Sequence, residues 1–297
     1  MSYIGIMKGE IDLIIYAIPG FIILMLLELY INYKQKKDLY ILKDSISSIT
    51  MGLGSIVIDL LTKLIYLSVF LYLYDNYRFF SFPNVWWSFL ILVVVNDFFF
   101  YWKHRMMHEV RFLWASHSVH HSSVKFNLST ALRQEWFGRY LAIFFYLGLP
   151  FLGFHPVMIL MAQSISLIYQ YWIHTETIKK LPVWFEFFMN TPSHHRVHHG
   201  SNDIYLDKNH AGTFIIWDRM FGTFQKELED EKVVFGLTQN LESYKIWDVA
   251  SFEWLNLWKD LSQKNISFKS RFLYLMKPPG WKHDGTGITT KELQKNL

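Results

Sequence analysis

The sequence contains no cysteine, and this single absence removes several kinds of site. Disulfides, iron–sulfur clusters, cysteine-based zinc fingers and cysteine nucleophiles are all excluded. Charged residues are also scarce: they make up 18% of the 297 residues, against about 25% in soluble domains. No G-x-G-x-x-G or P-loop pattern occurs, so no nucleotide cofactor is indicated. The net charge of +4 is small, and we expect no nucleic-acid partner.

Apolar residues fill the composition instead, and they are gathered in long runs. Hydrophobic residues account for 52% of the chain, with runs at 11–31, 49–74, 85–102 and 140–173. A transmembrane helix needs about 20 such residues. The last run is nearly twice that length and contains a Gly-Phe-His-Pro break at 153–156, which favours two helices joined by a tight turn. The sequence therefore predicts an all-α integral membrane protein with about five transmembrane helices, two of them as a 140–173 hairpin.

The loops between these runs differ in positive charge. Segment 32–44 carries four lysines, whereas segment 75–84 carries only Arg78. Because cytoplasmic loops hold the excess of lysine and arginine, we expect the N-terminus outside and segments 32–44 and 103–137 in the cytoplasm. The hairpin then returns the chain to the cytoplasm, where the C-terminus also lies. We expect a single membrane-embedded domain over 1–297, with a core at 90–240 and a polar C-terminal tail at 241–297.

Histidines are concentrated in three short motifs on this predicted cytoplasmic side. The spacings three and four place side chains on one face of a helix, so each motif aims its imidazoles at a common point. His174, at the end of the returning hairpin helix, arrives beside them. The motifs are HRMMH with His104 and His108, HSVHH with His117, His120 and His121, and HRVHH with His195, His198 and His199.

Nine histidines exceed what one metal ion can use, so the motifs predict a di-metal site in a cytoplasmic helical cap. Neutral imidazole binds iron, zinc, copper and nickel, and spacing alone does not separate these metals. His194 and His210 are close to the motifs in sequence, with His210 a candidate for the outer shell. The segment HEVRF lacks the second histidine of H-E-x-x-H, which disfavours a zinc protease.

Asp97 is the acidic residue in the third apolar run, seven positions before His104 and hence two turns away on the same helix face. Acids inside apolar spans are functional candidates. We expect the Asp97 carboxylate to accept the second ring N–H of a ligand histidine, which would orient that ligand. The alternative is an acid that meets water at the membrane interface.

Long segments around the motifs resemble the fatty acid hydroxylase and sterol desaturase superfamily. Within this superfamily they are similar to the branch that cleaves alkylglycerols. A weaker similarity to that branch is found in KPPGW (277–281). The segments are NDFFFYWKHRMMHEVRFLWASHSVHHSSVKFNLSTALRQ (96–134), YQYWIHTE (169–176) and NTPSHHRVHHGSNDIYLDKNHAGTFIIWDRMFGTF (190–224).

The resemblance implies a membrane-bound, non-haem di-iron monooxygenase that uses O2 to hydroxylate a lipid. In the alkylglycerol branch the carbon next to the ether oxygen is hydroxylated and tetrahydrobiopterin supplies electrons. Glu109 and Glu176 occupy motif positions, and the resemblance assigns them to orienting ligands or pterin. On the same grounds the iron ligands are His104, His108, His117, His120, His121, His174, His195, His198 and His199.

Two other functions stay open at this point. A fatty acid or sterol hydroxylase or desaturase of the same superfamily would use the same metal site, with a pterin or a redox protein as electron donor. A metal transporter or metal-binding membrane protein belongs to a different class. A transporter should place its ligands at mid-bilayer on several spans, whereas these histidines follow the ends of the apolar runs.

Overall fold

The computed structural model describes residues 13–297, and within them the protein is helical with no named strand. The only β pairing among these residues is an isolated bridge between Gly200 and Phe235. This confirms the all-α prediction. The main helices are α2 (Leu13–Gln35), α3 (Leu42–Tyr77), α4 (Trp86–Glu109), α5 (Arg111–His121), α6 (Ile143–Tyr146), α7 (Gly148–Leu152), α8 (Pro156–Trp172), α9 (Val183–Phe188), α10 (Pro192–His198), α11 (Ile216–Phe221), α12 (Ile246–Leu261), α13 (Phe268–Met276) and α14 (Thr290–Leu293).

Two described helices, α2 and α3, are long and apolar enough to cross a membrane. The most apolar 18-residue stretches of α2 and α3 have mean hydropathies of 2.3 and 2.0. Only 6% and 17% of the residues in these stretches are buried inside the protein. A water-soluble protein rarely exposes a continuous apolar surface of this size. The exposed faces of α2 and α3 therefore indicate a membrane protein. The N-terminus itself, with residues 11 and 12 of the first run, lies outside the described residues.

The other three predicted spans are not among the described helices that are both long and apolar enough to cross a membrane, so five spans remain a prediction. Helix α4 is 24 residues long, and α8 has 17. The hairpin forms, with Gly153 in the left-handed region (φ 95°) at its turn, but its first arm is the broken apolar segment Tyr140–Leu152. At 1.5 Å per residue that arm reaches about 20 Å, short of the roughly 30 Å hydrocarbon core.

Hydrogen bonds and an ion pair at the ends of the helices show which loops contact each other. At one end, the α2–α3 loop packs against segment 123–133: the Asn127 amide donates to Leu39 O (2.7 Å), and Asp44 forms a buried ion pair with Arg133. At the other end, the Phe79 N–H donates to Phe151 O at the hairpin turn (2.8 Å). Segment 32–44 thus lies against segment 123–133, whereas the side of a membrane that these segments occupy remains a prediction.

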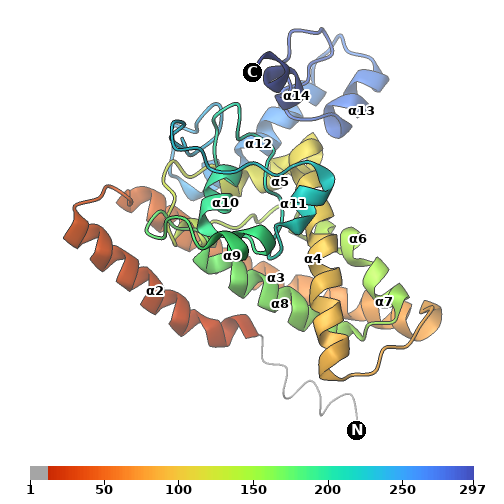
Figure 1. Ribbon diagram of the computed structural model, residues 1–297. Coiled ribbons are helices and arrows are strands. Elements are labelled where there is room, and N and C mark those ends of the chain that lie inside the picture. The colour runs from red at the N-terminus through yellow and green to blue at the C-terminus, as the bar shows by residue number, and fades with distance from the viewer. Residues whose placement is uncertain (1–12) are drawn as a thin grey trace.

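The residues of the predicted polar C-terminal tail, 241–297, form a folded layer. Helix α12 packs on α5, where Arg111 pairs with Glu253 (3.2 Å) and Asp260 (2.6 Å). The Tyr274 hydroxyl lies 2.9 Å from the ring of His283. Figure 1 shows α12–α14 at the upper end of the molecule, with α5, α10 and α11 between them and the long N-terminal helices. The histidine motifs lie in this middle region.

Candidate metal centre

Four helical segments deliver the predicted ligand histidines to one place. The last turns of α4 carry His104 and His108, and the turn after α8 carries His174. All nine side chains are buried. Helix α5 carries His117, His120 and His121, and α10 with its C-terminal residue carries His195, His198 and His199.

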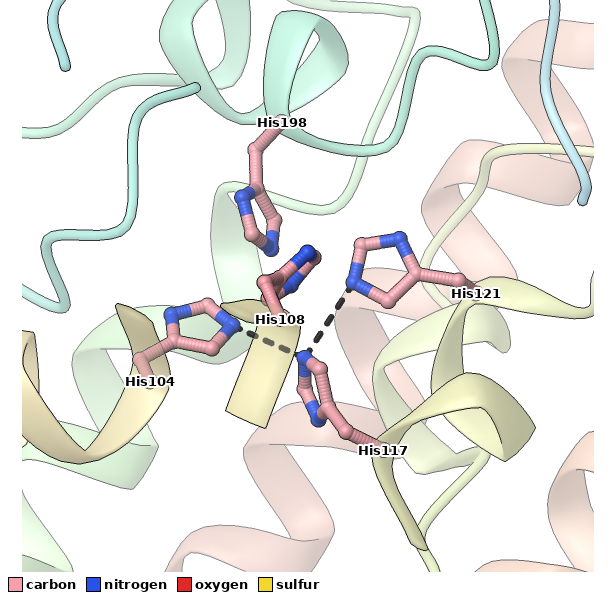
Figure 2. Close-up of side chains that lie close together, drawn as sticks. All are labelled: His104, His108, His117, His121 and His198. Carbon is pink, nitrogen blue, oxygen red and sulfur yellow. Dashed lines mark hydrogen bonds between the residues drawn. The ribbon is translucent and has the colours of Figure 1, made fainter. Parts of the chain in front are cut away.

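The nine histidines divide into two groups, each able to hold a metal ion. Within each group the candidate ligand atoms lie within 4.8 Å of one another. Figure 2 shows the rings of the larger group pointing toward a common centre. This geometry agrees with the predicted di-metal arrangement. The larger group is His104, His108, His117, His121 and His198, and the smaller is His120, His174, His195 and His199.

The distances between facing nitrogens match those around a metal ion. His117 Nε2 lies 2.8 Å from His104 Nε2 and 3.2 Å from His121 Nε2. In the smaller group, His174 Nε2 lies 3.1 Å from His120 Nε2 and 2.9 Å from His195 Nε2. Two nitrogens bound at right angles about 2.1 Å from one ion are themselves about 3.0 Å apart.

Hydrogen bonds between the rings do not explain the short distance between His120 Nε2 and His174 Nε2. His174 Nδ1 faces Gln170 O (2.7 Å) and His120 Nδ1 faces Arg133 O (3.1 Å), so each ring donates its one N–H to a carbonyl. Burial lowers the pKa of His120 to about 4 and that of His174 well below its ordinary value, so both rings are neutral. Their Nε2 lone pairs therefore point at each other, an arrangement that a shared cation stabilises.

Three further ring nitrogens of the two groups also lack a hydrogen-bond partner that would stabilise their lone pairs. His108 Nε2 and His198 Nε2 are buried without a hydrogen-bond partner among the described residues, as is His199 Nε2 in the smaller group. Buried polar atoms are normally satisfied, and a metal ion would satisfy all three. The donor set, imidazole nitrogen alone, suits iron, zinc, copper or nickel.

A loop that the motifs did not reveal, residues 207–210, supports the larger group from behind. Asp207 Oδ1 lies 3.3 Å from His108 Nδ1, Lys208 O lies 2.9 Å from His198 Nδ1, and His210 O lies 2.7 Å from His104 Nδ1. Such outer contacts fix the ring orientation of metal ligands. His210 thus contributes through its backbone carbonyl, and its ring does not belong to either group.

Asp97 has a different role from the one predicted, because its partners are not histidines. Its two carboxylate oxygens accept hydrogen bonds from Thr213 N (2.7 Å), Phe214 N (2.9 Å) and the indole N–H of Trp217 (3.1 Å). Asp97 therefore anchors the segment that follows His210. The backbone N–H groups of Thr213 and Phe214 are over 110 residues away in the chain, so the spacing between Asp97 and His104 could not reveal them.

The two glutamates and His194 lie near the site without contacting its ligand atoms. Glu109 pairs with Arg105 one turn earlier (3.1 Å). Glu176 follows His174 by two residues, and burial raises the pKa of its carboxyl. His194 is outside both groups, with its ring edge-on to Phe224 at 5.4 Å. Orientation of ligands or pterin by Glu109 and Glu176 remains a prediction.

An apolar cavity of about 330 Å³ opens onto both histidine groups. One wall comes from α2 and α3, through side chains such as Ile18, Phe21 and Ile49. The other end is formed by His104 and His117 of the larger group and by His120, His174 and His195 of the smaller group. A long apolar molecule could therefore reach the metal centre from the membrane-facing helices.

Comparison with known proteins agrees with this geometry. Residues 89–223 match the model of the fatty acid hydroxylase family. The chain is 42% identical to alkylglycerol monooxygenase of Homo sapiens over 275 residues, which cover 91% of this chain and 60% of that protein. The corresponding protein of Danio rerio is 40% identical, with 89% and 59% covered. The protein of Caenorhabditis elegans is 34% identical, with 82% and 50% covered.

The chain spans about 60% of the length of the first of these relatives and half of the last. No solved structure gives a significant match. The matched family region contains all nine histidines of the two groups as well as the supporting loop at 207–210. The chain therefore carries a fatty acid hydroxylase domain at residues 89–223 and is homologous to alkylglycerol monooxygenases over most of its length.

Proposed function

We propose that the protein is a membrane-bound, non-haem di-iron monooxygenase that hydroxylates an alkylglycerol at the carbon next to the ether oxygen. The observation that carries the proposal is the apolar cavity ending on ligands of both histidine groups. The identity of 42% to a protein named alkylglycerol monooxygenase supports the substrate class. Iron is the metal of choice because zinc offers hydrolysis without oxygen activation.

The apolar part of the cavity would bind the alkyl chain. Ile18, Phe21 and Met25 follow one face of α2, and Ile49 and Ile56 of α3 line the same space. Burial of a methylene group there contributes about 0.8 kcal/mol, so a long chain is held along its whole length. This binding would fix the chain so that one carbon lies beside the metal centre.

Polar side chains at the flank of the cavity would receive the glycerol hydroxyls. Lys103, Gln134, Glu135 and Gln170 line the main cavity and also a smaller adjoining space of about 130 Å³. Lys103 precedes the ligand His104, and Gln170 O holds the ring of His174, so this polar flank is next to the metals. The ether carbon, which joins the chain to the headgroup, would then face the histidine groups.

The bound irons would supply oxygen activation, and the protein would hold them and keep water away. Hydroxylation of one C–H bond by O2 consumes two electrons and two protons and releases one water. Tetrahydrobiopterin or another donor would supply the electrons. The product is a hemiacetal: its hydroxyl proton passes to the ether oxygen as that C–O bond breaks, which gives an aldehyde and glycerol.

The proposed placement follows from the same reasoning. The protein would cross the membrane several times, with the N-terminus outside and the histidine motifs and C-terminus in the cytoplasm. The contacts of Asn127 with Leu39 and of Arg133 with Asp44 support the placement of segments 32–44 and 103–137 on one side. A fatty acid or sterol hydroxylase is the near alternative, and methylsterol monooxygenase 1 of Rattus norvegicus is 27% identical over 158 residues. No observation favours the metal-transporter class.

The test uses purified protein in lipid nanodiscs, loaded with iron and supplied with 1-O-alkylglycerol, a tetrahydropterin and ¹⁸O2. We expect two irons per chain and a fatty aldehyde that carries one ¹⁸O atom, trapped by reduction to the alcohol. A free fatty acid and a sterol serve as alternative substrates. Hydroxylation of one of these with no aldehyde from the alkylglycerol would contradict the substrate assignment. If the iron-loaded protein formed no oxygenated product from any of these substrates, the result would contradict the enzyme class.

A further inference from the structure

Glu28 is the one buried residue of α2, although α2 is among the helices apolar enough to cross a membrane. Only 2% of its surface is exposed. Burial of a carboxylate costs free energy unless it is hydrogen-bonded or paired, and an acid within an apolar helix is a functional candidate. Glu28 belongs to neither histidine group and lines neither the lipid cavity nor the adjoining polar space. Its place in α2 therefore needs another explanation.

Three donors from separate parts of the chain bind the Glu28 carboxylate. Its Oε2 accepts hydrogen bonds from the Tyr40 hydroxyl and from Leu128 N (2.8 Å). Its Oε1 accepts a hydrogen bond from the Thr175 hydroxyl. Hydrogen bonds to a charged acceptor are about twice as strong as those between neutral groups. Glu28 therefore fastens α2 to the α2–α3 loop, to segment 123–133 and to the turn after α8.

Two of these contacts lie next to the smaller histidine group. Thr175 directly follows His174, a member of that group. Phe126, two residues before Leu128, stacks on the His174 ring with 5.6 Å between the ring centroids. The position of α2 is thus defined relative to His174 through the carboxylate of Glu28.

The face of α2 that carries Glu28 also lines the lipid cavity. Steps of three and four residues keep side chains on one face of a helix, and such steps lead along the cavity wall to Glu28. A helix rises about 1.5 Å per residue, and neighbouring carbons of an alkyl chain are a similar distance apart. A displacement of α2 by one residue would therefore carry a bound chain past the metal centre by about one carbon. The lining side chains on these steps are Ile14, Ile18, Phe21 and Met25.

The other contacts of α2 do not specify one register. Among the described helices, α8 is the one against which α2 packs extensively. The Tyr171 hydroxyl of α8 donates to Phe21 O (2.8 Å), but every turn of α2 offers similar carbonyls. Glu28 is the single acid of α2, so its three hydrogen bonds form in one register only.

We propose that Glu28 is a positioning residue that sets the register of α2 against the smaller histidine group and thereby selects the carbon of the lipid chain that is hydroxylated. The proposal rests on the proposed function. Hydroxylation next to the ether oxygen gives a hemiacetal that breaks into an aldehyde and glycerol, whereas hydroxylation one carbon further along gives a stable alcohol that keeps its ether bond. In both reactions one atom of O2 enters the C–H bond, and the other leaves as water with two electrons and two protons from the pterin or other donor. The two products therefore report the position of the chain.

The test compares the products of Glu28→Met with those of the wild type. Methionine replaces the carboxylate by a thioether, which is at most a weak acceptor. Iron-loaded protein in nanodiscs receives 1-O-alkylglycerol, a tetrahydropterin and O2, and both products are quantified by mass spectrometry. We expect the ratio of aldehyde to hydroxylated ether lipid to fall by at least about tenfold, which corresponds to about 1.4 kcal/mol. Glu28→Gln keeps an acceptor for Leu128 N and should retain more of the wild-type ratio. A residue that only stabilised the fold would change the yield and not the ratio.

The position of α2 is measured separately, without catalysis. Because the chain has no cysteine, spin labels can be attached at Ile23→Cys on the exposed face of α2 and at the exposed Asp203→Cys. The full chain is loaded with zinc, which is d¹⁰ and has no unpaired electron. We expect Glu28→Met to shift or broaden the distance between the labels. Glu229→Met, at a side chain that is 91% exposed, is the matched control and should keep both the distance and the product ratio.

Each outcome decides the proposal. An unchanged product ratio in a well-folded, iron-loaded Glu28→Met variant would overturn it, whatever the label distance. Tyr40→Phe removes one of the three donors and repeats the comparison should Glu28→Met fold poorly. If the wild type formed no oxygenated product from the alkylglycerol, the proposed function would fail by itself. The label distance would then decide whether Glu28 holds α2, and an unchanged distance would overturn the positioning role as well.

Discussion

The two histidine groups differ in which parts of the fold accept hydrogen bonds from the outer nitrogens of their rings. In the larger group, three rings face oxygens of the 207–210 loop. In the smaller group, His174 faces its own helix at Gln170 O, and His120 faces Arg133 O. Arg133 in turn pairs with Asp44 at the start of α3. The two histidine groups are therefore held by separate parts of the fold, and variants should be able to affect one group without the other.

Replacing His120 with alanine should remove one metal ion. Only three histidines of the smaller group would remain, and the loss should exceed the roughly 10–100-fold effect of an outer partner. We expect the iron content to fall from two to about one per chain and aldehyde formation to stop. Elemental analysis of the purified protein measures this.

The matched control is His194→Ala, since His194 is equally buried but lies outside both groups. It should retain both irons. A His120→Ala variant that kept two irons and its activity would argue against the smaller group as a metal position.

Asp97→Asn should lower stability rather than iron affinity. Asparagine would turn an NH2 group toward one of the N–H donors of Thr213, Phe214 or Trp217. Loss of a buried hydrogen bond to a charged acceptor costs about 2–3 kcal/mol. We expect a lower unfolding temperature in both the iron-loaded and the metal-free protein. A variant with normal metal-free stability but weakened iron binding would restore the role of Asp97 as a ligand-orienting group.

At the scale of elements, the loop 207–210 is a support for one metal position. Both Asp207 and Asn209 adopt positive φ angles, 54° and 56°, which costs conformational energy in residues other than glycine. Asp218 holds the loop by accepting hydrogen bonds from His210 N (2.7 Å) and Ala211 N (2.8 Å). The backbone is thereby fixed in the form that presents its carbonyls to the ligand rings.

Asp207→Ala should weaken the larger group selectively. The ring of His108 would lose its carboxylate partner, and outer contacts of this kind contribute about 10–100-fold to metal affinity. We expect one of the two irons to be released at a lower chelator concentration while the other is retained. Asp203→Ala, an exposed acid in the same segment, is the control. Equal weakening of both irons would contradict the separate support of the two groups.

The elements also show what could be predicted from sequence. The helical spacing of the three motifs predicted eight of the nine clustered histidines, because helix geometry fixes which side chains point together, and His174 was added from the predicted return of the hairpin. Only His210 of the 207–210 loop was predicted to lie in the outer shell, because two of the three contacts of this loop are made by backbone carbonyls, which leave no residue signature. Hydropathy found the 140–173 hairpin but overestimated its first arm, which is broken between α6 and α7. The C-terminal layer was missed because its polar composition does not reveal packing against α5.

At the scale of the whole molecule, the absence of cysteine allows the topology to be measured directly. We expect Gln35→Cys and Leu297→Cys to be labelled from the cytoplasm, and Phe79→Cys from the outside, because the α2–α3 loop and the hairpin turn lie at different ends of the helices. All three positions are exposed. A membrane-impermeant maleimide applied to intact cells should therefore modify only Phe79→Cys, and the unsubstituted chain gives the background.

Labelling of Gln35→Cys and Leu297→Cys instead would reverse the predicted orientation. Labelling of Phe79→Cys together with either of them would contradict the grouping of the loops. Neither result depends on the metal or on the substrate.

The exposed apolar faces of α2 and α3 have a kinetic consequence. Those two helices form the outer wall of the cavity that ends on the histidines, so a substrate that entered there would diffuse laterally in the bilayer and never cross bulk water. Turnover would then depend on the mole fraction of substrate in the membrane rather than on its molar concentration in the sample. Dilution of the substrate with inert phospholipid, at constant total substrate, should slow the enzyme, whereas dilution of the whole suspension with buffer should not.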